Sequence, residues 1–171
     1  MCIRDSSDVD GFELNIFQEL NMLPAPFDGL FLSMNVTKTD GKSSLDVDNG
    51  TVSFPFRKLA EDVSNISIGY DKNKFDIRLS AVSRSPYLDY LADDDSETIQ
   101  EDLDNNNIRY TDDHTQIDFN LKYKINKNLS LKFDLNNITD EPEFYYWGTP
   151  DRLSQYDEYG TTVSIGLRYT Y

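Results

Sequence analysis

The side chains best suited to bind a small molecule lie close together near the C-terminus. Six aromatic residues surround Gly148 and Pro150: Phe144, Tyr145, Tyr146, Trp147, Tyr156 and Tyr159. Aromatic rings stack on sugar or catechol-like rings, and their polar tips form hydrogen bonds. We therefore name Tyr145, Tyr146, Trp147 and Arg152 as candidate ligand contacts. The alternative role for these rings is an aromatic belt at a membrane interface, together with packing of the surrounding loop.

A second concentration of polar groups is an acidic stretch at residues 88–114. It holds ten carboxylates against one basic residue, Arg109: Asp89, Asp93, Asp94, Asp95, Glu97, Glu101, Asp102, Asp104, Asp112 and Asp113. The simpler interpretation is a solvated connection, and the alternative is a site for a divalent cation or a cationic ligand. The lone histidine, His114, has no thiol nearby, and Asp46–Gly50 lacks the spacing of a calcium-binding EF-hand. We therefore predict no metal site and no cofactor.

Catalytic motifs are also missing from the sequence. It contains no phosphate-binding loop, no nucleophile elbow and no CxxC pair. Carboxylates are abundant, but abundance in a connecting segment is not a catalytic geometry. We predict no catalytic residue and no enzyme activity.

Apolar residues recur at every second position in several segments, and this pattern predicts the strands that would position these side chains. In the last strand the apolar members are Val163, Ile165, Leu167, Tyr169 and Tyr171, and polar residues occupy the positions between them. The same alternation recurs upstream, which predicts about seven strands: 12–20, 30–37, 65–70, 75–82, 116–125, 129–136 and 160–171. No run of about 18 apolar residues exists for a transmembrane helix.

The connections between these strands alternate in length. Short turns are expected at residues 23–29, 71–74 and 126–128, and long loops at 39–61, 87–114 and 140–158. Short turns on one rim and long loops on the other are typical of an outer-membrane barrel. A soluble sandwich is the alternative, but consecutive long hairpins favour a single curved up-and-down sheet over two facing sheets.

Charge and cysteine content limit the partners. The chain carries 31 acidic and 16 basic residues, for a formal net charge of −15. This excess disfavours nucleic acid, whose phosphates need Lys and Arg.

The single cysteine, Cys2, cannot form an internal disulfide. It lies in residues 1–7, which match no pattern downstream and are expected to be a non-native or scar segment before a domain at 8–171. We also expect that the reading frame lacks its true beginning, because no secretory signal is present.

The C-terminal third resembles a known family. The run from Asn126 to Pro142 contains Asn137-Ile-Thr-Asp140, an aromatic loop follows, Gly160 opens the last strand, and the chain ends on Tyr171. This order of features is similar to the closing block of TonB-dependent outer-membrane receptors, over about residues 115–171. The resemblance identifies the sheet as an open C-terminal segment of a large transmembrane β-barrel, with the plug domain absent.

This resemblance implies a location and partners. The location is the bacterial outer membrane, with the long loops extracellular and the short turns periplasmic. The partners are membrane lipid, the barrel-assembly machinery, the TonB complex through a missing N-terminal part, and a small-molecule or oligosaccharide ligand. The assembly machinery would recognise the last strand through Val163, Ile165, Leu167, Tyr169 and Tyr171. The implied function is uptake of a bulky scarce nutrient: a siderophore, cobalamin or an oligosaccharide. A passive or structural barrel, or a soluble all-β binding module, remains the alternative.

Overall fold

The computed structural model describes residues 5–47, 50–91 and 99–171. Cys2 of the expected scar segment, and Asp93, Asp94, Asp95 and Glu97 of the acidic stretch, lie outside the described residues. The strands are β1 (Asp5–Glu19), β2 (Leu30–Val47), β3 (Gly50–Pro55), β4 (Asp62–Lys72), β5 (Phe75–Arg84), β6 (Tyr87–Leu91), β7 (Ile108–Thr111), β8 (His114–Lys124), β9 (Leu129–Asn136), β10 (Glu143–Trp147), β11 (Leu153–Asp157) and β12 (Thr162–Tyr169). The helices are a 3-10 turn, Phe27–Gly29, and α1, Ile99–Asp104. Neither of these described helices is long and apolar enough to cross a membrane.

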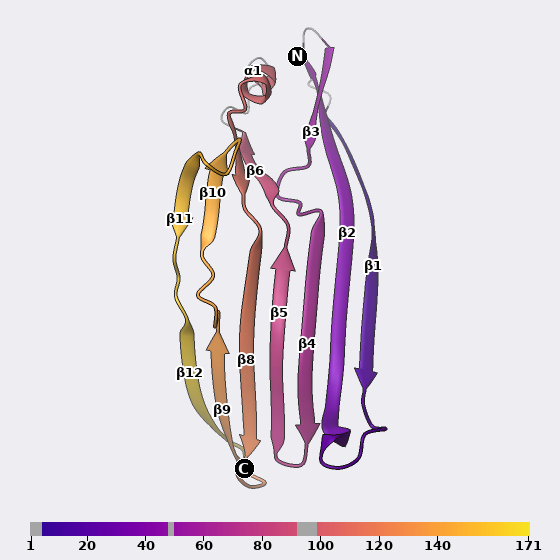
Figure 1. Cartoon of the computed structure of the whole chain (residues 1–171), viewed down its shortest axis with the longest axis vertical. Coiled ribbons are helices and arrows are strands. Elements are labelled where there is room, and N and C mark those ends of the chain that lie inside the picture. The colour runs from indigo at the N-terminus through magenta and orange to yellow at the C-terminus, as the bar shows by residue number, and fades with distance from the viewer. Residues whose placement is uncertain (1–4, 48–49, 92–98) are drawn as a thin grey trace.

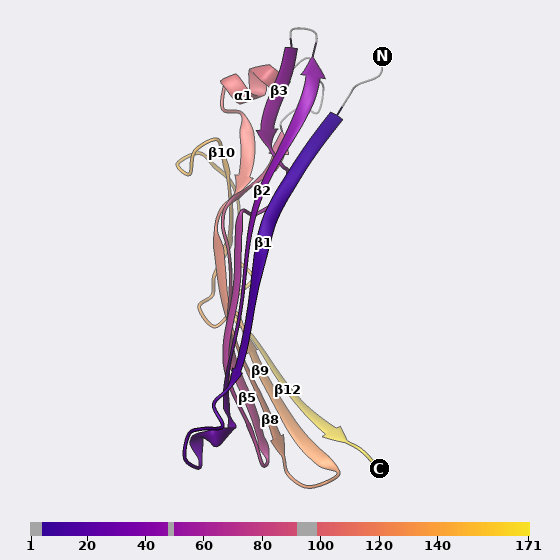
Figure 2. The ribbon, with the colours of Figure 1, turned by 90° about the vertical axis from the view of Figure 1, so that its right-hand side faces the viewer.

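The main sheet is an antiparallel meander. Its path runs β1-β2-β4-β5-β8-β9-β12, and β3 pairs with β2 beside it (Figure 1). These seven path strands are the seven predicted from alternation, so the all-β fold class is confirmed. Figure 2 shows that they form one curved layer. The sheet does not close on itself, because β1 and β12 each pair on one side only among the described strands. This geometry is that of an open segment of a larger barrel.

One face of this sheet is apolar from β2 to β12. The strand register aligns a single row across six strands: Leu32, Ile68, Leu79, Phe119, Leu135 and Val163. The next row toward the short turns is equally apolar: Leu30, Tyr70, Ile77, Leu121, Phe133 and Ile165. Several of these side chains are exposed in the isolated chain: Ile68 is 48% exposed and Ile165 is 72% exposed. Because no second protein layer covers them among the described residues, their natural covering is the hydrocarbon of a bilayer.

The opposite face is polar and hydrogen-bonded. Asn120 and Asp134 are direct neighbours in the register, and Asn120 Nδ2 donates to Asp134 Oδ1 at 2.9 Å. Lys132 Nζ lies 2.8 Å from the other carboxylate oxygen of Asp134. In a barrel with lipid outside, this face lines the interior, where water or protein can satisfy its charges.

The predicted turn chemistry is partly confirmed. Between β4 and β5 the chain turns in two residues, and Asn73 there has φ of 58°. Asparagine tolerates this left-handed conformation better than most residues, as expected for a tight hairpin. Between β8 and β9 the turn is held differently, because Asn126 Oδ1 accepts hydrogen bonds from the backbone N–H groups of Asn128 and Leu129, each at 2.9 Å.

The long connections were wrongly expected to be loops. β2 continues through residue 47 and forms a hairpin with β3, and residues 87–114 contain β6, α1 and β7. Residues 140–158 contain β10 and β11. β1 also begins at Asp5 instead of Phe12, with Ser6 and Ser7 paired to Ser44 and Ser43. The extensions of β1 and β2 are mostly polar, so apolar alternation could not reveal them; backbone pairing between the two strands holds them instead.

A close contact on the polar face gives the first testable expectation. Phe31, Gly69 and Arg78 form one row across β2, β4 and β5, and the Phe31 ring covers Gly69 so closely that a Cβ there would overlap it. Phe31 is 8% exposed, and the Arg78 guanidinium lies 5.4 Å from the ring centre. We expect Gly69→Val to destabilise the closed barrel by about 1–3 kcal/mol through overpacking, measured by urea unfolding in detergent micelles.

The control variants isolate this contact. Ser67→Val places the same side chain on the same face, one row away, and is expected to have a much smaller effect. Adding Phe31→Ala to Gly69→Val removes the overlapping ring and is expected to recover part of the lost stability. Equal destabilisation by Ser67→Val and Gly69→Val would contradict the proposed role of the Phe31 ring.

Candidate functional site

The long connections gather at one end of the molecule, opposite the short turns (Figure 1). There a second sheet has the order β11-β10-β7-β6. Beside it lie α1 and the β2–β3 hairpin. We call this end the rim. It is more folded than a set of solvated loops, because strand pairing and a small core hold its segments together.

The rim has its own hydrophobic core. The tightly buried members, each at most 6% exposed, are Val52, Leu88, Leu91, Ile99 and Ile108. Leu45, Phe54, Leu103 and Tyr110 pack against them. These residues come from β2, β3, β6, α1 and β7, so the core joins segments that are distant in sequence. It positions the side chains that face the cavity described next.

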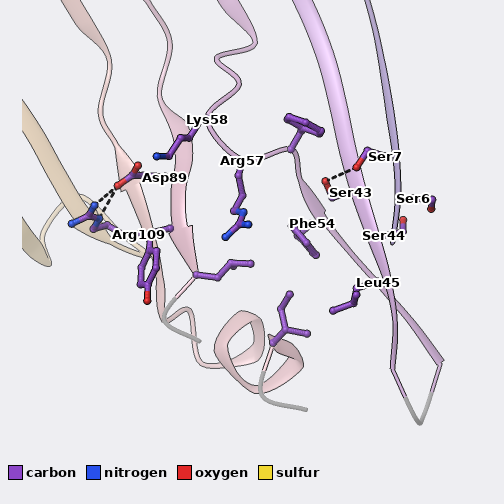
Figure 3. Close-up of a pocket in the computed structure, with 14 residues that line it drawn as sticks. Ser6, Ser7, Ser43, Ser44, Leu45, Phe54, Arg57, Lys58, Asp89 and Arg109 are labelled. Atoms are coloured by element: carbon purple, nitrogen blue, oxygen red, sulfur yellow. Dashed lines mark hydrogen bonds and ion pairs between the residues drawn. The ribbon is translucent and has the colours of Figure 1, made fainter. Parts of the chain in front are cut away.

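A cavity of about 720 Å³ opens between the β2–β3 hairpin and the β6–β7 pair. Its lining combines hydroxyls, an apolar floor and charged groups (Figure 3): Ser43, Phe54, Arg57, Lys58, Asp89 and Arg109 are among its residues. Arg109 Nε donates to Asp89 Oδ2 at 2.9 Å, and a terminal nitrogen of the same guanidinium donates to the same oxygen. The side chains of Arg109 and Asp89 are 27% and 11% exposed. A partly buried, charge-assisted pair of this kind fixes the guanidinium in place.

Aromatic rings frame the Arg109 guanidinium. It lies 5.2 Å from the centre of the Tyr145 ring and 5.9 Å from that of Tyr90. Tyr90 in turn meets Trp147 edge to face, with ring centres 6.5 Å apart. Cation–π contacts at these distances hold the guanidinium and rings as one unit. We call Asp89, Tyr90, Arg109, Tyr145 and Trp147 the arginine–aromatic cluster.

The predicted ligand contacts divide between two faces of β10. Tyr145 and Trp147 belong to the arginine–aromatic cluster. Tyr146 points the other way: it is 8% exposed and stacks on Tyr110 with ring centres 5.6 Å apart. Arg152 Nη1 donates to the backbone carbonyl of Asn106 at 3.1 Å. The structure therefore brings Tyr145 and Trp147 together, and places Tyr146 and Arg152 in supporting contacts.

The sequence analysis did not name Arg109, Asp89 or Tyr90 as ligand contacts. One sequence feature could have pointed to Arg109, because it is the only basic residue within the acidic stretch at 88–114. Its partners could not be chosen from ten carboxylates without the β6–β7 register, which places Tyr90 opposite Arg109. The pairing also assigns Asp89 to an ion pair instead of a cation site. Within the described ranges, no three His, Cys, Asp or Glu side chains gather as metal ligands.

The Tyr145 hydroxyl has a defined protonation state. It donates to Glu143 Oε2 at 2.7 Å, and this hydrogen bond, with burial and the carboxylate charge, raises the pKa of Tyr145 above its usual value. The phenol therefore stays protonated and neutral over the physiological pH range. The Tyr145 ring thus faces Arg109 as a neutral aromatic surface.

The predicted assembly residues lie in the main sheet, on β12 and directly after it. Val163, Ile165, Leu167 and Tyr169 share the apolar face of β12, and each is more than half exposed. Tyr171 follows the strand, with its ring centre 5.9 Å from that of Tyr169. β12 pairs with β9 and is an edge strand of the main sheet. The apolar row of β12 is therefore continuous with the apolar face of the main sheet.

Comparison with known proteins agrees with this architecture. A family model described as TonB dependent receptor-like, beta-barrel matches residues 3–138. This chain belongs to that family. The match covers β1 to β9, most of which lie before the segment that carries the C-terminal resemblance, and it begins within residues 1–7. No curated protein matches, and no solved structure matches.

Family membership indicates a location and a class of protein. TonB-dependent receptor barrels are outer-membrane proteins, and their class is transport, not enzyme catalysis. The apolar face and the polar face of the main sheet are then the lipid side and the interior side of a barrel wall. The rim holds the cavity and the arginine–aromatic cluster at one end of that wall.

Proposed function

We propose that this chain forms part of the wall and ligand-facing rim of an outer-membrane active-transport receptor for a bulky scarce nutrient: a siderophore, cobalamin or an oligosaccharide. The observation that carries the proposal is the pair of apolar rows that cross β2, β4, β5, β8, β9 and β12 in a chain of the TonB-dependent receptor family. The rim is extracellular and the short turns are periplasmic. A soluble binding module would have to cover the same apolar rows with protein.

The arginine–aromatic cluster supplies the ligand contacts in this proposal. Asp89 already neutralises Arg109, so the cluster offers rings and fixed donors more than net charge. Such a surface suits sugar or catechol-like rings, which combine a flat face with hydroxyl groups. Tyr145 and Trp147 make the ring contacts, while Tyr146 and Arg152 hold β10 and its turn in place.

Two further partners belong to the same proposal. The barrel-assembly machinery recognises β12 through its apolar row and Tyr171. The TonB complex supplies energy through a part of the receptor outside this chain. The exposed apolar row of β12, with the Tyr171 ring beside that of Tyr169, supports the first partner, and family membership supports the second.

Uptake by cells that carry the complete receptor tests the function. The probes are a ferric catecholate, cobalamin and a maltodextrin, each radiolabelled. We expect saturable uptake of one probe, and loss of that uptake when the inner-membrane proton gradient is dissipated. A passive barrel would instead pass several probes without saturation and without dependence on the gradient, and that result would overturn the proposal.

Substitution at the cluster tests the proposed contacts. Trp147→Ala is expected to weaken binding of the transported probe by about tenfold to a hundredfold, the usual cost of losing one stacking ring at a binding hot spot. Tyr159→Ala is the matched control, because Tyr159 is 70% exposed outside the cluster. The affinities are measured by equilibrium binding to the detergent-solubilised receptor. Equal affinities of the two variants would show that Trp147 does not contact the probe.

A further inference from the structure

The polar face carries a group of cations at the end with the short turns. Lys122 on β8 and Lys132 on β9 are direct cross-strand neighbours. One row closer to the turn, Lys124 and Arg168 lie on either side of Ser130. Like charges placed directly opposite each other destabilise a sheet. The arrangement is therefore unfavourable wherever no negative charge lies nearby.

Few carboxylates offset this charge. Asp134 contacts Lys132, and Asp76 lies beside Lys122 in the register. Within the described part of the chain, no ion pair is found for Lys124, Lys127 or Arg168. The whole chain has a net charge of −15, so a local excess of cations stands out against the overall charge balance.

These cations surround a cavity. It has a volume of about 350 Å³, and its lining contains four cations and no carboxylate: Lys122, Lys124, Lys127 and Arg168, with Ser130 and Thr170 contributing hydroxyls. A concave polar surface lined by one sign of charge concentrates counter-ions of the other sign. The cavity therefore attracts anions.

The framework around this cavity is fixed by two hydrogen bonds. The N–H of Thr170 donates to the Asn128 carbonyl at 2.8 Å, and Asn128 Nδ2 donates to the Thr170 carbonyl at 2.6 Å. These bonds tie the β8–β9 turn to the residue after β12. Lys127 and Arg168 are thereby held on neighbouring segments, although they are far apart in the sequence.

We propose that this cavity, defined by Lys122, Lys124, Lys127 and Arg168, binds a polyvalent oxyanion on the interior face of the barrel near its periplasmic end. Neighbouring strands are about 4.8 Å apart, and same-face residues along a strand are about 7 Å apart. Lys122 and Lys124 lie in successive rows of β8, and Arg168 lies two strands away on β12, so these cations are spread more widely than one carboxylate or phosphate group. An anion with several charged oxygens engages both rows. The interior position rests on the proposed function, and the anion preference rests on the cavity itself.

Isothermal titration of the complete receptor in neutral detergent tests this site, with pyrophosphate and citrate as the two probes. We expect saturable binding of at least one probe, weakened about tenfold when the salt concentration rises from about 0.05 to 0.3 M, because screening reduces each charge contact. Preference for pyrophosphate would assign the site to phosphate groups, and preference for citrate would assign it to carboxylates. Absence of saturable binding by the wild-type receptor would overturn the proposal.

Matched variants locate the binding. Lys124→Gln/Arg168→Gln is expected to lower the affinity at least about tenfold, since two charge-assisted contacts are lost. Lys124→Arg/Arg168→Lys keeps the charges and is expected to retain binding. Lys42→Gln, an exposed position on β2, removes one positive charge far from the cavity and is expected to leave affinity unchanged. Unaltered affinity of the double glutamine variant would overturn the proposal; if that variant does not fold, Arg168→Gln alone takes its place.

A separate measurement distinguishes this proposal from the proposed function. Heat-modifiable migration in gel electrophoresis reports whether the receptor forms a closed barrel, and energy-dependent uptake reports transport. A closed barrel without anion binding refutes only the anion site. Anion binding by a barrel without energy-dependent uptake refutes only the transport function.

Discussion

Leu79→Arg is expected to cost the closed barrel about 2–4 kcal/mol of folding free energy, the usual penalty for a basic residue near the bilayer midplane of a barrel. Leu79 lies in the middle of β5, between Ile68 and Phe119 in the continuous apolar row. It is 43% exposed in the isolated chain, so its outer surface meets lipid. A guanidinium at this depth has no water or counter-charge on the lipid side.

The neighbouring residue provides a sharp control. Ser80 lies on the opposite face of the same strand, with Ser67 and Asp118 as its register neighbours. Ser80→Arg therefore introduces the same side chain into the barrel interior, beside a carboxylate, and is expected to cost much less. The two variants are compared by urea unfolding of the receptor refolded in phospholipid vesicles. If Ser80→Arg were the more damaging variant, the assignment of the lipid face would be reversed.

The main sheet was predictable because its strands obey one simple physical rule. Each spanning strand contacts lipid on one side and the polar interior on the other, so every second residue is apolar, as in Phe119, Leu121 and Tyr123. The rule also holds across strands, since the register keeps apolar residues beside apolar residues. Alternation therefore identified the seven strands of the meander, although several of their ends were misplaced.

The rim was not predictable by the same rule. Its strands are short, and its core collects Val52, Leu88, Ile99 and Ile108 from separate segments with no common period. The aromatic residues near Trp147 were recognised as a platform by residue type alone. Their division into Tyr145 and Trp147 on one face and Tyr146 on the other depends on β10 being a strand, which the long-loop prediction excluded.

Asn137→Ala is expected to destabilise the closed barrel by about 2–4 kcal/mol, because one side chain holds the β9–β10 connection in several ways. Asn137 is 8% exposed, and its backbone has a φ of 54°. Its Oδ1 accepts from the Glu141 N–H at 2.9 Å, and its Nδ2 donates to the Glu141 carbonyl at 3.0 Å. Its N–H donates to Asp118 Oδ1 at 2.9 Å, and its carbonyl accepts from the Thr161 hydroxyl at 2.9 Å. Alanine keeps the backbone partners, leaves the Glu141 peptide groups unsatisfied and tolerates this φ poorly.

Further substitutions separate the two contributions in urea unfolding of the refolded receptor. Asn137→Gly accepts the positive φ and loses only the side-chain hydrogen bonds, so it is expected to lie between wild type and Asn137→Ala. Asn65→Ala, an exposed asparagine on the polar face of β4, is the matched control and is expected to change stability by less than about 0.5 kcal/mol. Equal losses for alanine and glycine at position 137 would assign the whole effect to the Glu141 hydrogen bonds. A loss no larger than that of Asn65→Ala would show that the Asn137-Ile-Thr-Asp140 segment is held by its backbone contacts alone.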